Sequence, residues 1–238
     1  MSALYLLRHG QAGSRNDYDK LSDLGHRQAD SLGQYLATQK LEFTAILCGA
    51  MRRQRETAQH TIDAFAAAGL ALPELVIDER WNEFDLGQVY EELAPFLSES
   101  DADFKREYAE MMANYDDLNA PFHRNSTAMD AKVFRAWLSG KFPYRGESWL
   151  DFHARVVAAL NDLRRYADVG NVAVFTSATP TAIGVGYAMG VTELRAVRIA
   201  GLTFNSSIST LRIHPADFTL FSFNAVPHLP DSALRSFR

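Results

Sequence analysis

Short apolar runs alternate with amphipathic stretches over the first part of the chain and again toward its end. The runs at 4–7, 43–47, 75–77 and 172–176 are bounded by polar or turn-forming residues, which predicts short strands of the kind buried in a parallel sheet. After the first run, Ser22 can cap a helix whose apolar residues recur at helical spacing: Leu24, Ala29, Leu32 and Leu36. Strands and helices in this alternating order predict an α/β fold with parallel pairing and right-handed crossovers.

The same pattern predicts further helices and a hairpin. The turn at 49–53 leads into a helix that ends at Gly69, because glycine readily takes the left-handed conformation that stops a helix. Ser148 can cap another helix, and Pro180 suits the first turn of a third. Two late strands predict a hairpin: Ile208–Ile213 and Phe218–Phe223.

Residues 88–146 interrupt the alternation. Acidic residues, aromatics and methionines are mixed between Ser98 and Asp117, which favours solvated helical segments over buried strands. We therefore expect one domain, residues 1–238, with a helical insertion at about 88–146. A long insertion in an α/β frame is a natural candidate for a lid over a site.

Charge and composition narrow the classes of function. The 238 residues carry a formal net charge of −5, which argues against a general nucleic-acid surface. No run of about 18 apolar residues is present, so no membrane span is expected. Cys48 is the only cysteine, which excludes an internal disulfide and fits a reducing compartment. The chain enters a strand without a charged and apolar leader, so we expect a cytoplasmic protein, with a homodimer as one alternative for its oligomeric state.

The end of the first predicted strand carries the residues best suited to chemistry. Parallel sheets normally hold their sites at the carboxyl ends of the strands, and there the chain places Arg8, His9 and Gly10. A guanidinium is a planar set of donors suited to phosphate, and an imidazole nitrogen can act as nucleophile or base. Glycine allows a sharp turn and the approach of an anion to the main chain.

These residues also carry a resemblance. The segment 6–11, Leu-Leu-Arg-His-Gly-Gln, resembles the N-terminal signature of the histidine phosphatase superfamily, which includes phosphoglycerate mutases and acid-type phosphatases. The segment 49–58 is similar to the family stretch Ser-Pro-Leu-x-Arg-Ala-x-Gln-Thr-Ala, and it places Arg53 at the phosphate-binding position. The segment 81–87 resembles Leu-x-Glu-x-x-x-Gly, so Glu83 corresponds to the general acid, with Asp85 as the alternative.

The resemblance implies both a fold and an activity. The expected fold is a three-layer α/β/α sandwich around a mostly parallel sheet. The expected activity is that of a phosphatase that needs no metal or cofactor and acts on a phosphorylated small molecule. His9 would attack phosphorus, Arg8 and Arg53 would hold the outer oxygens, and Glu83 would protonate the leaving alcohol. Mutase activity is the less favoured alternative. Further matches at 21–29, 146–148 and 224–229 are interpreted as architectural.

One position departs from the family pattern. A second catalytic histidine is expected after the strand at 172–176, and this chain has Ser177 there. Serine can donate a hydrogen bond to a phosphoryl oxygen, but it brings no positive charge. Weak activity is therefore expected, and a phosphate-binding or regulatory protein with little turnover is the main alternative. Five histidines are candidates to substitute in space: His26, His123, His153, His214 and His228.

Two other kinds of nucleophile are less favoured. Cysteine phosphatases place an arginine six residues after the cysteine, whereas the sixth residue after Cys48 is Gln54. Ser177, Asp217 and His228 follow the chain order of the α/β-hydrolases. The serine elbow of that fold needs small residues two places either side, and here phenylalanine and threonine occupy them. We therefore interpret Cys48 as an ordinary buried cysteine and Ser177 as the residue that begins a helix.

Overall fold

The computed structural model describes residues 2–14, 17–117, 120–123 and 128–237. The chain divides into two compact units. The first comprises residues 1–13, 17–83 and 155–238, and the second comprises residues 14–16 and 84–154. The predicted insertion at 88–146 therefore falls within the second unit.

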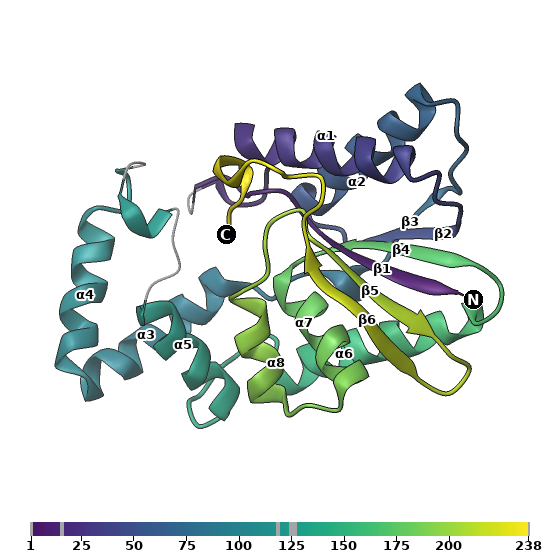
Figure 1. Cartoon of the computed structure of the whole chain (residues 1–238). Helices are drawn as coiled ribbons and strands as arrows, with labels where there is room; N and C mark the ends of the chain where they lie inside the picture. The colour runs from purple at the N-terminus through teal and green to yellow at the C-terminus, as the bar shows by residue number, and fades with distance from the viewer. Residues whose placement is uncertain (1, 15–16, 118–119, 124–127, 238) are drawn as a thin grey trace. The chain divides into compact units, whose positions relative to one another are not determined.

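A six-stranded sheet forms the centre of the first unit, in the order β3-β2-β4-β1-β5-β6 (Figure 1). Its strands are β1 (Ala3–Arg8), β2 (Phe43–Cys48), β3 (Leu75–Ile77), β4 (Asn171–Thr176), β5 (Ile208–Ile213) and β6 (Phe218–Ala225). The first four strands pair in parallel, and β5 and β6 add an antiparallel hairpin beside β1. The mostly parallel sheet is confirmed. Because β1 and β4 are parallel neighbours, their carboxyl ends meet at the same edge.

Helices cover both faces of this sheet. In Figure 1, α1 (Asp23–Thr38) and α2 (Arg52–Ala67) lie on one face, and α7 (Ala178–Met189) and α8 (Glu193–Ala200) lie on the other. Short 3₁₀ turns complete the unit: η2 (Glu79–Trp81), η4 (Leu163–Tyr166) and η5 (Ser232–Leu234). This arrangement is the expected α/β/α sandwich.

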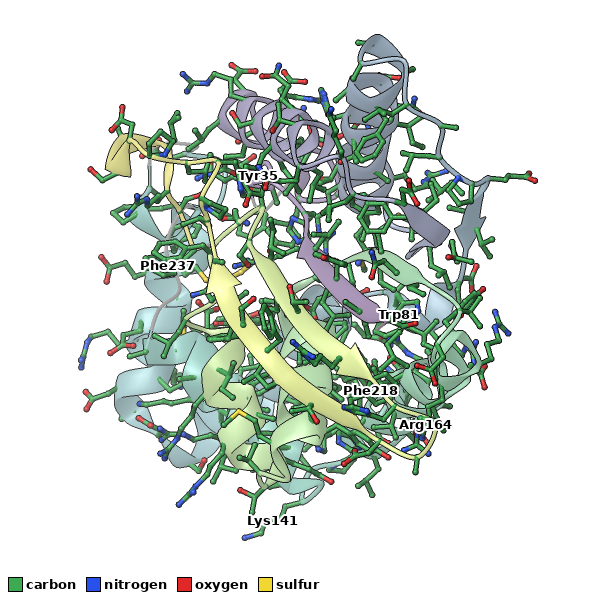
Figure 2. The ribbon with its side chains drawn as sticks, turned by 45° about the vertical axis from the view of Figure 1, so that its right-hand side comes forward. Tyr35, Trp81, Lys141, Arg164, Phe218 and Phe237 are labelled. Atoms are coloured by element: carbon green, nitrogen blue, oxygen red, sulfur yellow. The ribbon has the colours of Figure 1, made fainter. Side chains whose placement is uncertain are left out.

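The core and the helix ends follow the predicted pattern. Apolar side chains from β1, β2, β4, α1 and α2 form a buried cluster that includes Leu7, Leu32, Leu36, Ile46, Phe65 and Phe175. Ser22 caps α1 by accepting the Gly25 N–H at 3.1 Å, as expected. Gly69 follows α2 with φ +68°, a left-handed conformation that ends the helix. Trp81 is fully buried, and Arg164 lies over the Phe218 ring at 5.9 Å (Figure 2).

The second unit is helical. It contains α3 (Leu86–Ser100), α4 (Ala102–Ala113), η3 (Pro121–His123) and α5 (Ala128–Ser139), and α6 (Trp149–Asp162) begins within it. Its centre is a cluster of aromatic rings, in which Phe84 stacks on Trp137 at 4.5 Å. Phe134, Trp149 and Phe152 complete the cluster. None of the helices in the described ranges has both the length and the apolar character that crossing a membrane requires.

Candidate functional site

Main-chain hydrogen bonds fix the position of His9. The residue follows β1 directly, and its N–H donates to the carbonyl of Thr176, at the end of β4, at 2.9 Å. Its own carbonyl accepts the N–H of Ser206 at 3.0 Å. The Ser206 hydroxyl in turn lies 2.9 Å from the ring of His228. The backbone at position 9 is thus held from two directions without any contribution from the imidazole.

The imidazole of His9 is buried and has a defined tautomer. Its Nδ1 lies 2.6 Å from the carbonyl oxygen of Gly10, which can only accept, so Nδ1 carries the hydrogen. Nε2 therefore bears the lone pair, and it accepts the Nε–H of Arg53 at 3.2 Å. Burial lowers the pKa of His9 well below its usual range, and the nearby cations Arg53 and Arg8 lower it further. The neutral imidazole is the nucleophilic form, and its Nε2 lone pair becomes available when a bound anion takes over the hydrogen bond from Arg53.

Arg53 lies in the first turn of α2 and is only 3% exposed. Its Nη1 pairs with Asp19 Oδ1 at 3.0 Å, and the ring of Tyr18 lies 4.7 Å from its guanidinium carbon. The other oxygen of Asp19 accepts the N–H of Arg52 at 3.1 Å, at the start of the helix. Asp19 therefore offsets the unfavourable placement of arginines at a helix N-terminus. The sequence did not reveal Asp19 or Tyr18, because both lie in an irregular loop.

Arg8 is the second buried cation. Its Nη1 donates to the carbonyls of Thr203 and Phe237, while its Nε has no hydrogen-bond partner among the described residues. Burial lowers the pKa of Arg8 to about 10, and Arg53 acts in the same direction, whereas Tyr18 and Glu83 oppose the decrease. The guanidinium therefore remains charged at neutral pH. The charges of Arg53 and Glu83 thus both act on the Arg8 guanidinium.

Glu83 lies against the N-terminus of α7. Its Oε2 accepts the N–H of Thr179 at 3.0 Å. The turn before it is held by Arg155, whose Nη1 donates to the carbonyls of Arg80 at 2.8 Å and Asn82 at 2.9 Å. The alternative acid, Asp85, is the N-cap of α3. Asp85 caps α3 by accepting the N–H of Gln88 at 3.0 Å.

Ser177 stands at the N-cap of α7 and is fully buried. Its Oγ accepts a hydrogen bond from Gln54 Nε2 at 2.8 Å, and the same amide nitrogen donates to the Trp81 carbonyl at 3.1 Å. Gln54 is also fully buried, and nothing in the local sequence marks it as a site residue. A residue that acts through a neighbour leaves no periodic signal in the sequence.

The structure thus brings the predicted residues to one edge of the sheet. Arg8 and His9 end β1, Arg53 follows β2, and Ser177 follows β4. Glu83 joins them through the first turn of α7. Two buried guanidiniums, a neutral imidazole and a helix N-terminus with a carboxylate beside it form a site suited to a tetrahedral anion.

Cys48, His228 and His26 have surroundings that disfavour the alternative roles considered for them. Cys48 is buried, and burial raises the pKa of its thiol to about 12, so the nucleophilic thiolate is disfavoured. His228 bonds to Ser206 rather than to Ser177, and burial lowers the pKa of His228 to about 4. His26 bonds to His60 at 2.9 Å. The side chain of another candidate, His123, lies outside the described part of the chain.

A comparison with protein families assigns the chain. The family described as the histidine phosphatase superfamily (branch 1) matches residues 4–128 and 112–226. The chain belongs to the histidine phosphatase superfamily. These ranges contain His9 and its neighbours at the site, so the resemblance seen in the sequence is confirmed at the level of the family.

One curated relative matches part of the chain. A 2,3-bisphosphoglycerate-dependent phosphoglycerate mutase from Mesorhizobium japonicum is 34% identical over 95 residues, which cover 36% of this chain and 44% of the mutase. The match therefore spans less than half the length of that curated relative.

Solved structures share the fold over nearly the whole chain. YhfR from Bacillus stearothermophilus has a TM-score of 0.63 at 18% identity and covers 96% of this chain and 100% of its own. A mycobacterial glucosyl-3-phosphoglycerate phosphatase with inorganic phosphate has a TM-score of 0.61 at 21% identity, with coverage of 95% and 98%. An Entamoeba histolytica phosphoserine phosphatase variant with phosphoserine has a TM-score of 0.56 at 18% identity, with coverage of 96% and 100%.

Proposed function

We propose that this histidine phosphatase hydrolyses a phosphate monoester of a small molecule through a phosphohistidine at His9. The observation that carries the proposal is the tautomer of the buried ring. The Gly10 carbonyl accepts a hydrogen bond from Nδ1–H, so the lone pair is on Nε2, where it accepts the Arg53 N–H until a substrate phosphate binds that guanidinium. A neutral, oriented nucleophile next to buried cations suits attack on a phosphorus atom whose outer oxygens are negatively charged.

The first step transfers the phosphoryl group to the ring. His9 Nε2 forms a bond to phosphorus while the bond from phosphorus to the ester oxygen breaks. Arg8 and Arg53 stabilise the charge on the outer oxygens, and the Glu83 carboxyl gives its proton to the leaving oxygen, which departs as the alcohol. The negative charge of a bound phosphate beside Glu83 favours the protonated carboxyl, which is the form that this step needs.

The second step returns the enzyme to its starting state. A water molecule attacks the phosphohistidine, and the Glu83 carboxylate accepts the proton of that water. The bond from phosphorus to Nε2 breaks, inorganic phosphate leaves, and the ring is again neutral. No metal or cofactor takes part in this scheme, and the mutase alternative differs only in the acceptor of the phosphoryl group.

A second function, binding without efficient turnover, is favoured by one observation. Ser177 is uncharged and stands where the family pattern has a histidine, so the transition state lacks one cationic donor. Such a protein would hold a phosphorylated ligand and release it unchanged.

One experiment tests both functions. Release of phosphate from a generic phosphate ester is measured in EDTA for the wild type, for His9→Ala and for His214→Ala, which removes an exposed histidine of the β5–β6 hairpin. The phosphatase proposal expects release that His9→Ala abolishes and His214→Ala preserves, together with an acid-labile phosphoenzyme. If the wild type binds the ester but shows no phosphate release that His9→Ala abolishes, the phosphatase proposal is refuted and the binding function is supported.

A further inference from the structure

Gln54 and Ser177 form a buried pair whose members come from different helices. Both side chains are 0% exposed, and Gln54 Nε2 donates to Ser177 Oγ at 2.8 Å. The second hydrogen of that amide nitrogen goes to the carbonyl of Trp81 at 3.1 Å. Since a carbonyl can only accept, the nitrogen of the amide, and not its oxygen, faces Ser177.

This assignment determines how the serine hydroxyl is used. The oxygen of Ser177 already accepts from Gln54, so its own hydrogen must point elsewhere. Among the described residues, Gln54 is the only hydrogen-bond partner of the Ser177 hydroxyl. A buried hydroxyl whose hydrogen lacks an acceptor is costly unless a ligand provides one. Ser177 is the N-cap of α7, and Glu83 accepts the N–H of Thr179 in the first turn of that helix, so the hydroxyl lies at the same helix N-terminus as the proposed acid.

Three differences from the family pattern, as the resemblance in sequence aligns it, are connected in space. Gly49, Gln54 and Ser177 stand where the family pattern has serine, alanine and histidine. A Cβ added to Gly49 would lie 2.0 Å from Gln54 Oε1, so the glycine makes room for the glutamine. On the other side, a ring at position 177 would overlap the Gln54 amide, which already contacts Ser177 Oγ. The large glutamine therefore fills the space that two smaller residues leave.

We propose that Gln54 is a positioning residue that orients the Ser177 hydroxyl toward a phosphoryl oxygen, so that the pair replaces the family's second histidine. The proposal rests on the phosphatase function proposed above. Gln54 holds the acceptor side of the hydroxyl, and Ser177 donates to the anion. The pair supplies a directed neutral donor in place of an imidazolium.

A set of variants tests the pair. Ser177→Ala removes the donor and is expected to lower kcat/KM about 100-fold. Gln54→Met keeps the side-chain length and removes the amide, and we expect a loss of about tenfold because the hydroxyl is no longer oriented. Since both act through one hydrogen bond, the double variant should lose no more than Ser177→Ala alone. Gln59→Ala, an exposed glutamine of the same helix, is the matched control and should behave as the wild type.

Restoring the family pair gives the sharper test. Ser177→His alone should be less active or less stable than the wild type, because Gln54 occupies the space of the ring. Gln54→Ala with Ser177→His should exceed that single variant at least about tenfold in kcat/KM. Its pH profile should also show the ionisation of the introduced imidazole, which Gln54→Ala alone lacks. The proposal would be overturned if the losses in kcat/KM of Ser177→Ala and Gln54→Met multiply in their double variant. It would also be overturned if Ser177→His is as active as Gln54→Ala with Ser177→His.

Measurement of vanadate affinity shows whether the role of Gln54 and Ser177 fails or only the phosphatase function fails. If the wild type shows no release that depends on His9, the phosphatase function fails, and vanadate affinity still reports on the pair. Gln54→Met and Ser177→Ala should then each weaken vanadate binding, and the double variant should be no weaker than Ser177→Ala. Unchanged affinity in the folded Gln54→Met variant would contradict the role of Gln54 directly.

Discussion

Glu83→Gln should separate substrates by the quality of their leaving group. The substitution keeps the size of the side chain, and the amide oxygen of glutamine can still accept the Thr179 N–H that Glu83 Oε2 accepts at 3.0 Å. The proton that would be given to the leaving oxygen is therefore the main loss. An alkyl phosphate, whose alcohol leaves poorly without that proton, should suffer most.

The size of the effect follows from the role assigned to the carboxyl. A positioned acid contributes about 10²–10⁴-fold to the rate, which corresponds to about 2.7–5.4 kcal/mol in the activation free energy. With glycerol phosphate, kcat/KM should fall by that factor. With p-nitrophenyl phosphate the leaving phenolate needs little protonation, so the loss should stay below about tenfold. The assay is initial-rate phosphate release from both esters with wild type and variant.

Asp85→Asn provides the matched control for this experiment. Asp85 caps α3, and asparagine is an equally good cap, so the folded structure should be retained. We expect both esters to be hydrolysed at rates close to those of the wild type. Equal losses on the two esters in Glu83→Gln would refute the assignment of the acid. A dependence on the leaving group that appears in Asp85→Asn instead would transfer the role to Asp85.

Three further predictions concern the surroundings of the site. Burial gives His228 a pKa of about 4, against about 6.5 in an unfolded chain. As the pH falls, this histidine is therefore protonated in the unfolded state at a higher pH than in the folded state. The free energy of unfolding should therefore drop by about 3 kcal/mol between pH 7 and pH 4, and urea denaturation of His228→Gln should lack that part of the decrease. Arg155→Met removes the donor to two carbonyls of the turn before Glu83. We expect a loss of about 2 kcal/mol in the free energy of unfolding together with a lower kcat. An unchanged kcat would show that the turn keeps its position without Arg155. Gly49→Ser should lower the free energy of unfolding of the wild type by about 1–3 kcal/mol, because its Cβ would meet Gln54. The same serine should be tolerated in Gln54→Ala, and equal destabilisation in both backgrounds would argue against the steric explanation.

The fold was largely predictable because its elements have strong local signals. The strands β1, β2 and β4 are apolar runs that are buried in the sheet, and the carboxyl ends of those parallel strands bring Arg8, His9 and Ser177 to one edge. Capping by Ser22 and the stop at Gly69 depend on neighbouring residues only. The helix α8 was not predicted, because its eight residues (Glu193–Ala200) offer too short a periodic pattern.

The contacts that tune the site were not predictable in the same way. Asp19 reaches Arg53 from an irregular loop, and Gln54 reaches Ser177 across a separation of 123 residues. Such contacts depend on how elements pack, and neither charge pattern nor periodicity reports on packing between distant segments. The first turn of α2 is an electrostatically unfavourable position for Arg53. The carboxylate that offsets this charge became visible only in the folded chain.

A histidine that its own main chain holds in place can be removed without losing the frame around it. The N–H and carbonyl of His9 bond to Thr176 and Ser206 whatever side chain the residue carries. His9→Ala should accordingly retain a vacant space lined by the two guanidiniums, in which an uncleaved ester can stay bound. Mass spectrometry of small molecules that copurify with this variant would then be a direct route to the natural substrate.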